Sequence, residues 1–148
     1  MRQLQAFAAI IACLVTPALA IVPGQDDWTV VTMAPDGSWG SATEPSSGQA
    51  LARAIRNCKA MSGTKIGCGA QSTAIQAGWI VATRCGNRNI MVAELQHADA
   101  ERTVREQETD LREHYAPNLP PCRRVLTVNP RGGVIVATSQ DEAGTATY

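Results

Sequence analysis

The sequence predicts an α+β domain, in which an antiparallel sheet carries two helices packed on one side and two disulfides cross-link the chain. Short runs rich in β-branched residues and Trp occur in pairs around turn residues, as in β-hairpins. Two longer stretches have apolar residues three and four positions apart, which is typical of amphipathic helices. An export signal at the N-terminus leaves four cysteines, an even number that favours two disulfides.

Residues 1–20 have the layout of a cleavable signal peptide. A charged start at Arg2 precedes an apolar run over residues 6–15, and small residues follow up to Ala20. The apolar run is shorter than the roughly 20 residues that span a bilayer. We therefore expect cleavage after Ala20, a spacer over 21–27, and export to the periplasm or the exterior.

One alternative concerns Cys13, which follows Ile-Ile-Ala and loosely resembles a lipoprotein cleavage site. In that case the mature chain would be anchored to a membrane through an acylated Cys13. The apolar run continues past Cys13, however, and this favours ordinary cleavage after Ala20. Cys13 is then lost with the signal.

The first half of the domain predicts a hairpin, a helix and a strand. Pro35, Asp36 and Gly37 form a turn because Pro presets φ, Asp bonds its own backbone and Gly takes positive φ. Ser46 and Gln49 fit a helix capping box, in which a Ser cap is followed three residues later by Gln. The expected elements are strands over 28–33 and 38–43, a helix from the Ser46 cap to Gly63, and a strand over 66–75 that contains Cys68.

The same order recurs at an offset of 51 residues, where Trp79 matches Trp28. The hairpin–helix–strand pattern used twice indicates a possible internal duplication. In the second helix, Ala100, Val104, Leu111 and Tyr115 form the apolar stripe, and Glu101/Arg105 and Glu108/Arg112 are i,i+4 ion pairs. The expected elements are strands over 79–83 and 90–93, a helix over 98–115, and a last hairpin over 122–128 and 134–137. A single domain thus covers 28–138, and 139–148 is a flexible polar tail.

Several short motifs carry a family resemblance. Trp28-x-Val-Val, Trp39-Gly40, an Ala-x-x-x-Ala helix over 50–54 that ends in Cys58, and Cys68-Gly69-Ala70 resemble the bacterial domain of unknown function 4189. The resemblance covers roughly residues 28–82 and is weaker beyond. It implies an exported, cysteine-linked α+β domain with no established activity, and it assigns no catalytic residues.

The expected topology suggests how the cysteines pair. Cys58 ends the first helix and Cys68 follows after a short Gly-containing loop, so these two lie close together. Cys85, at the turn of the second hairpin, and Cys122, at the start of the strand after the second helix, remain for each other. A Cys68–Cys85 link between neighbouring strands is the main alternative. Metal binding is disfavoured, because the cysteine spacing lacks a Cys-x-x-Cys pair and no histidine lies at ligand distance.

Catalytic chemistry has little support in the sequence. His97 and His114 are the only imidazoles, and helix geometry places them on different faces of the second helix. No phosphate-binding glycine motif, nucleophile elbow or zinc-protease motif is present, and no cofactor is implied. We expect a non-catalytic binding module of the cell envelope or exterior. The alternative is a small hydrolase or cell-wall-active enzyme that uses His97 or His114 with a nearby carboxylate.

The candidate binding residues are arginines. Pairing of Cys85 with Cys122 would gather Arg84, Arg88, Arg123 and Arg124 around one end of the sheet, with Arg131 as a further member. Such a basic patch suits an anionic partner, either an envelope component or a protein. The formal net charge of the chain is zero, which gives no general attraction to nucleic acid or to an anionic membrane.

Overall fold

The computed structural model describes residues 26–136. The predicted signal peptide, Cys13 and the predicted tail over 139–148 lie outside these residues. The elements follow the order β1 (Trp28–Met33), β2 (Trp39–Glu44), α1 (Ser47–Met61), β3 (Gln71–Gln76), β4 (Trp79–Cys85), β5 (Arg88–Glu94), α2 (His97–Asp110), the π-helix η1 (Leu111–Tyr115), β6 (Cys122–Val128) and β7 (Val134–Val136). The predicted class is confirmed: the chain is α+β, with antiparallel strands, two helices and two disulfides.

The strands form two antiparallel sheets rather than one. The first has the order β2-β1-β3 and the second the order β5-β4-β6-β7. Each sheet therefore contains a ββαβ unit in which the first strand is central, flanked by the second strand and by the strand that follows the helix. The two units repeat the same topology, as the predicted hairpin–helix–strand repeat requires.

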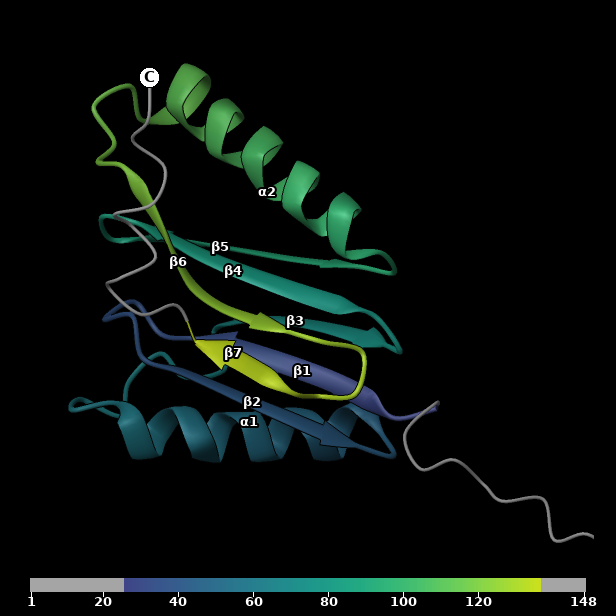
Figure 1. Cartoon of the computed structure of the whole chain (residues 1–148). Coiled ribbons are helices and arrows are strands. Elements are labelled where there is room, and N and C mark those ends of the chain that lie inside the picture. The colour runs from purple at the N-terminus through teal and green to yellow at the C-terminus, as the bar shows by residue number, and fades with distance from the viewer. Residues whose placement is uncertain (1–25, 137–148) are drawn as a thin grey trace, which may run out of the picture.

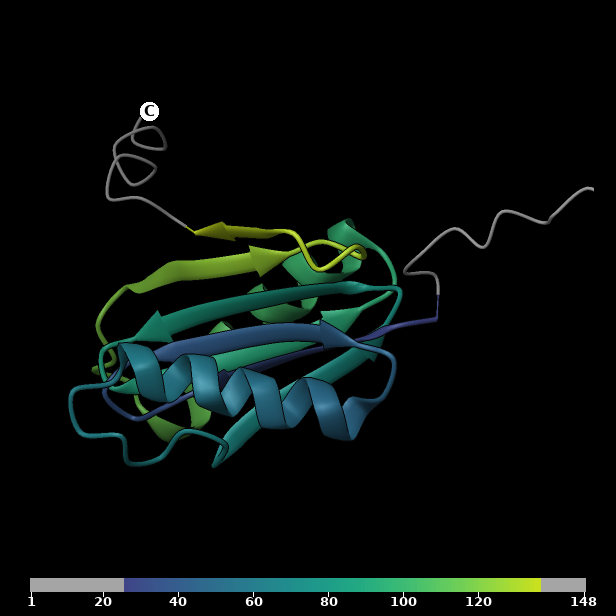
Figure 2. The same cartoon turned by 90° about the horizontal axis from the view of Figure 1, so that it is seen from below.

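The two helices lie on opposite outer faces of the paired sheets (Figure 1). The prediction that both helices pack on one side of a single sheet was therefore wrong. Seen from below, α1 lies across the outer face of the first sheet (Figure 2). The layers are thus helix, sheet, sheet and helix. The reason is that alternate residues of a strand point to opposite faces: Val30 packs against α1, whereas Val31 packs in the core between the sheets.

The core between the sheets consists of aliphatic side chains from both units. Val31 and Met33 of β1 pack with Ile80 and Ala82 of β4, and Leu126 and Val128 of β6 complete the cluster. All six are fully buried. Both faces of β1 and β4 are covered, and this explains why residues 28–33 and 79–83 are apolar or β-branched throughout rather than alternating.

Helix α1 lies unusually close to β2 at Gly40. A Cβ added at Gly40 would lie 2.1 Å from the Ala54 carbonyl oxygen and 2.4 Å from the Cys58 nitrogen. Only a glycine allows this approach. The predicted cap is present, because Ser46 Oγ accepts a hydrogen bond from the Gln49 backbone N–H at 3.3 Å. Ser46 also donates to Gln49 Oε1 at 3.1 Å.

Two element boundaries differ from the prediction. The strand expected over 66–75 begins only at Gln71, so Cys68 lies in the preceding loop. Lys65, Gly67 and Gly69 take positive φ there, and this conformation is incompatible with a strand. The helix expected over 98–115 ends as an α-helix at Asp110 and continues as the π-helix Leu111–Tyr115.

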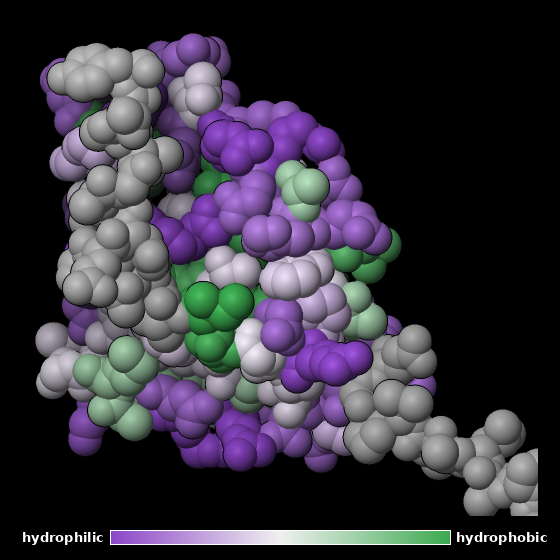
Figure 3. Space-filling view, in the orientation of Figure 1, coloured by the Kyte–Doolittle hydropathy of each residue, from purple (hydrophilic) through white to green (hydrophobic). Residues whose placement is uncertain are grey.

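Strand β7 forms one edge of the second sheet and exposes a short apolar run. Val134 and Ile135 are exposed, with 61% of Ile135 accessible. The space-filling view shows this hydrophobic patch over β7, below the hydrophilic side chains of α2 (Figure 3). The neighbouring strand is β6, and Leu126 of β6 lies opposite Val136 of β7 in the antiparallel register.

Candidate functional site

Both predicted disulfides are present. Cys58, in the last turn of α1, bonds Cys68 in the loop before β3. Cys85 and Cys122 are direct partners across β4 and β6, with their Cα atoms 4.0 Å apart. The alternative Cys68–Cys85 link does not form. Each disulfide therefore closes one ββαβ unit.

The four candidate arginines lie at one end of the second sheet, but their side chains do not form one patch. Arg123 and Arg124 are adjacent in β6 and therefore point to opposite faces. In the strand register, Arg88 lies opposite Cys85 and Arg84 lies opposite Arg123. Residues opposite each other share a face of the sheet, so Arg84 and Arg123 both lie on the face away from α2. Proximity in the chain brings these arginines to one end of the sheet, but the alternation of strand side chains divides them between its two faces.

Two of these arginines are engaged in contacts within the protein. Arg84 donates to the Pro35 carbonyl oxygen at 2.8 Å and to Asn89 Oδ1 at 2.6 Å, and so connects the hairpin turns of the two units. Arg124 donates to both carboxylate oxygens of Glu101 in α2, at 2.6 and 2.7 Å. Arg88 and Arg123 are exposed to solvent.

Glu101 is the centre of a small charge network under α2. Besides the two bonds from Arg124, its carboxylate lies 3.4 Å from His97 Nε2 and 3.9 Å from Arg105 Nη1. The hydrogen bond from Arg124 is the main reason that the pKa of Glu101 lies below its usual value; partial burial opposes this shift, and the nearby positive charges reinforce it. The network fixes α2 against β6.

The two histidines occupy opposite ends of the second helical segment. His97, the first residue of α2, stacks against Trp79 with ring centroids 4.5 Å apart. His114 Nδ1 lies 3.0 Å from Asp110 Oδ1. Both imidazoles are about half exposed or more, and within residues 26–136 neither is hydrogen-bonded to a hydroxyl or a thiol. An imidazole–carboxylate pair is present in each case, but without a bonded nucleophile.

A groove runs between the β4–β5 turn and the end of α2. Its volume is about 350 Å³. Arg88, which is exposed, and Tyr115, which is 76% exposed, both contribute to its wall. The groove is lined by Arg88, Asn89, Ile90, Gln107, Asp110, Leu111 and Tyr115. Charged, amide, aliphatic and aromatic groups from three elements thus share one surface.

Two other hollows offer less varied chemistry. The hollow over residues 102–113 has a volume of about 370 Å³, but helix α2 and its π-helical extension supply all of its lining residues. A smaller one of about 190 Å³ lies between α1 and β3, lined by small and aliphatic residues such as Val30, Gly48 and Leu51. Of these three hollows, the groove beside Arg88 combines an exposed ring with an arginine that has no ion pair within residues 26–136.

Tyr115 was predicted on the buried stripe of the second helix, and this prediction was wrong. The π-helix places the Ala116 N–H on the Leu111 carbonyl oxygen at 2.8 Å, five residues back. The wider turn changes the angular step between residues, so Tyr115 leaves the stripe defined by Ala100 and Val104. Arg112 instead donates to the Leu119 and Pro120 carbonyl oxygens, and the predicted Glu108/Arg112 ion pair does not form among the described residues.

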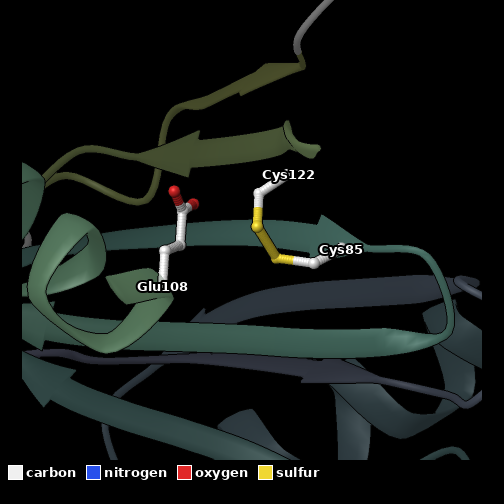
Figure 4. Close-up of side chains that lie close together, drawn as sticks. All are labelled: Cys85, Glu108 and Cys122. Carbon is white, nitrogen blue, oxygen red and sulfur yellow. A yellow bond between two sulfur atoms is a disulfide. The ribbon is translucent and has the colours of Figure 1, made fainter. Parts of the chain in front are cut away.

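Glu108 instead lies beside the Cys85–Cys122 disulfide (Figure 4). One carboxylate oxygen and the two sulfurs all lie within 4.8 Å of one another. Because thiolates rather than disulfide sulfurs bind metals, this trio is no metal site while the bond is intact. Arg112 Nη2 approaches the same bond, 3.6 Å from Cys122 Sγ.

No protein-family model matches the chain, and no curated protein or solved structure matches it either. The resemblance to the domain of unknown function 4189 stays a prediction. Among the described residues, no helix has both the length and the apolarity needed to cross a membrane. The two disulfides are consistent with an oxidising compartment.

Proposed function

We propose that the chain is an exported binding module that holds an acidic polysaccharide of the cell envelope in the groove beside Arg88. The observation that carries this proposal is the composition of the groove: exposed Arg88 and exposed Tyr115 both line a hollow of about 350 Å³. Export agrees with the signal-like N-terminus and with two disulfides.

The groove chemistry fits a charged sugar. A guanidinium pairs with a carboxylate or phosphate through two parallel hydrogen bonds. An exposed aromatic ring offers an apolar platform with a polar hydroxyl at its tip, and the side-chain amides of Asn89 and Gln107 both donate and accept, as sugar hydroxyls do. Asp110, the acidic residue of the groove, already has a partner in His114 at 3.0 Å.

The binding proposal is tested with an oligogalacturonate as the acidic probe and a neutral oligosaccharide of equal length. We expect weak, salt-sensitive binding of the acidic probe alone, since exposed charges are screened at high ionic strength. Arg88→Gln should reduce the affinity about tenfold, the effect of losing roughly 1.4 kcal/mol.

The matched control is Arg56→Gln, which removes the same charge from the exposed face of α1. This variant should bind like wild type. Equal binding of the neutral and acidic probes, or equal losses in the two variants, would show that Arg88 does not select the ligand.

The export proposal has its own test. The intact mass of the protein recovered from cells should correspond to a chain that starts at Ile21 with four cysteines in disulfides. A mass that retains an acylated Cys13 would replace this account with a lipid-anchored protein. Neither outcome depends on the groove.

A further inference from the structure

The Cys85–Cys122 disulfide has charged neighbours of a kind that Cys58–Cys68 lacks. Arg112 Nη2 lies 3.6 Å from Cys122 Sγ, and the Glu108 carboxylate lies within 4.8 Å of both sulfurs. Among the described residues, no charged side chain lies at hydrogen-bond distance from the sulfurs of Cys58 or Cys68. The two disulfides of one molecule therefore have different electrostatic surroundings.

Arg112 is held in place by the protein. Its guanidinium donates to the Leu119 carbonyl oxygen at 2.6 Å and to the Pro120 carbonyl oxygen at 2.9 Å. It belongs to the π-helix Leu111–Tyr115, and such π-turns occur frequently at functional sites. These two carbonyl acceptors hold the guanidinium beside the disulfide, so a fixed cation lies next to Cys122 Sγ.

The two sulfurs also differ in accessibility. Cys85 is fully buried, whereas Cys122 is partly exposed at the start of β6. Of the two cysteines, Cys122 is therefore the one closer to solvent and the one we expect an external thiolate to attack. The nearby guanidinium attracts that thiolate and stabilises negative charge on the Cys122 sulfur.

We propose that Cys85–Cys122 is a thiol–disulfide exchange site that oxidises a dithiol of a partner protein. A partner thiolate attacks Cys122 Sγ, a mixed disulfide forms, and the Cys85–Cys122 bond breaks with Cys85 leaving as a thiolate. The partner's second thiolate then attacks the partner sulfur of the mixed disulfide, and Cys122 leaves as a thiolate held by Arg112.

The exchange balances in electrons and protons. Two electrons pass from the partner's thiols to Cys85 and Cys122, and the partner gains a disulfide. Of the two protons that the partner releases, one reaches the Cys85 thiolate by way of the Glu108 carboxylate and the other passes to water. Because Arg112 stabilises the Cys122 thiolate, the reduced form is favoured, and this makes the disulfide a better oxidant.

The test uses the native full-length mature protein and dithiothreitol as the dithiol probe. Samples are quenched over time, alkylated and analysed by mass spectrometry for each cysteine. Cys85 and Cys122 should be labelled at least about tenfold faster than Cys58 and Cys68, in line with the dependence of exchange on thiol pKa and access. Equal labelling of the two pairs in wild type would overturn the proposal without any variant.

Variants identify the role of Arg112. Arg112→Gln should slow the opening of Cys85–Cys122 about tenfold, whereas Arg112→Lys should retain most of the rate because it keeps the charge. Arg102→Gln, an equal loss of charge on an exposed part of α2, should react like wild type. Unchanged kinetics in Arg112→Gln would contradict the assignment.

A pH profile separates this role from a structural one. In protein with only Cys85–Cys122 reduced, alkylation of Cys122 should titrate well below the ordinary thiol pKa of about 8.5. Arg112→Gln should move the profile back toward that value. A Cys122 profile at the ordinary thiol pKa in wild type would show that Arg112 does not activate the sulfur.

Discussion

The ion pair between Glu101 and Arg124 connects α2 to β6 through two parallel hydrogen bonds of 2.6 and 2.7 Å. Its geometry is that of a bidentate guanidinium–carboxylate pair, the stronger form of ion pair in proteins. A quarter of the Glu101 side chain remains accessible, so solvent weakens the pair. Arg124 therefore acts as a structural residue rather than as part of an open anion site.

We expect Glu101→Gln to lower the free energy of unfolding by about 1 kcal/mol at pH 7, because the charged hydrogen bonds are replaced by weaker ones. The pKa of Glu101 is depressed in the folded state, so its stabilising effect is complete above the unfolded pKa of about 4.3. The effect is lost as the pH falls through the depressed folded pKa.

Urea unfolding of both proteins between pH 7 and pH 3 measures this difference. The stability gap between wild type and Glu101→Gln should close in the acidic part of that range. Glu106→Gln is the control, because Glu106 is exposed and 3.8 Å from Arg102. A gap that stays constant down to pH 3 would mean that the charge of Glu101 does not stabilise the fold.

The contact between α1 and β2 depends on the absence of a side chain at Gly40. The Ala54 carbonyl and the Cys58 nitrogen occupy the space that a Cβ would need. The helix is further fixed by Cys58–Cys68 and by Asn57 Nδ2, which donates to the Ser41 carbonyl oxygen at 2.8 Å. The whole helix would have to move to accept a larger residue.

Gly40→Ala should therefore lower the free energy of unfolding by about 1–3 kcal/mol, the usual cost of overpacking. Gly48→Ala provides the matched comparison, since Gly48 lies in α1 with nothing within 4 Å of an added Cβ. This second change should raise stability by about 0.5 kcal/mol through helix propensity. Equal effects of the two substitutions in thermal unfolding would rule out the close approach.

The presence of most strands and helices and the pairing of the cysteines were predictable from the sequence. The residues at which these strands and helices begin and end were not. The Trp28 and Trp79 strands, both hairpins and both disulfides followed from turn chemistry and cysteine order. The late start of β3 depends on the positive φ of Lys65, a non-glycine residue that no turn rule singles out. The π-helix at Leu111 likewise has no periodicity signal, and it determines where Tyr115 points.

At the scale of the whole molecule, two ββαβ units meet through their sheets. Hydrogen bonds supplement the apolar core at one end: Asn89 Nδ2 donates to the Ala34 carbonyl oxygen at 3.0 Å, and Arg84 donates to that of Pro35 at 2.8 Å. The sequence predicted the repeat but placed both helices on one side. The information it lacks is which face of each apolar strand meets a helix, because both faces are buried.

Leu126→Ala tests the core between the sheets. Leu126 is fully buried there, and its truncation should cost about 2–5 kcal/mol. Ile135→Ala, in the same hairpin but 61% exposed, should cost much less. Comparable losses for the two variants in denaturant unfolding would contradict the face-to-face packing of the sheets.

Binding of an acidic polysaccharide in the groove beside Arg88 can be measured by NMR titration of the ¹⁵N-labelled mature domain with an oligogalacturonate. We expect the largest chemical-shift changes on the amide signals of Arg88, Gln107 and Tyr115, and we expect Arg88→Gln to need about tenfold more ligand to reach the same changes. Changes centred on Arg123 or on α1, or no saturable changes at all, would contradict it.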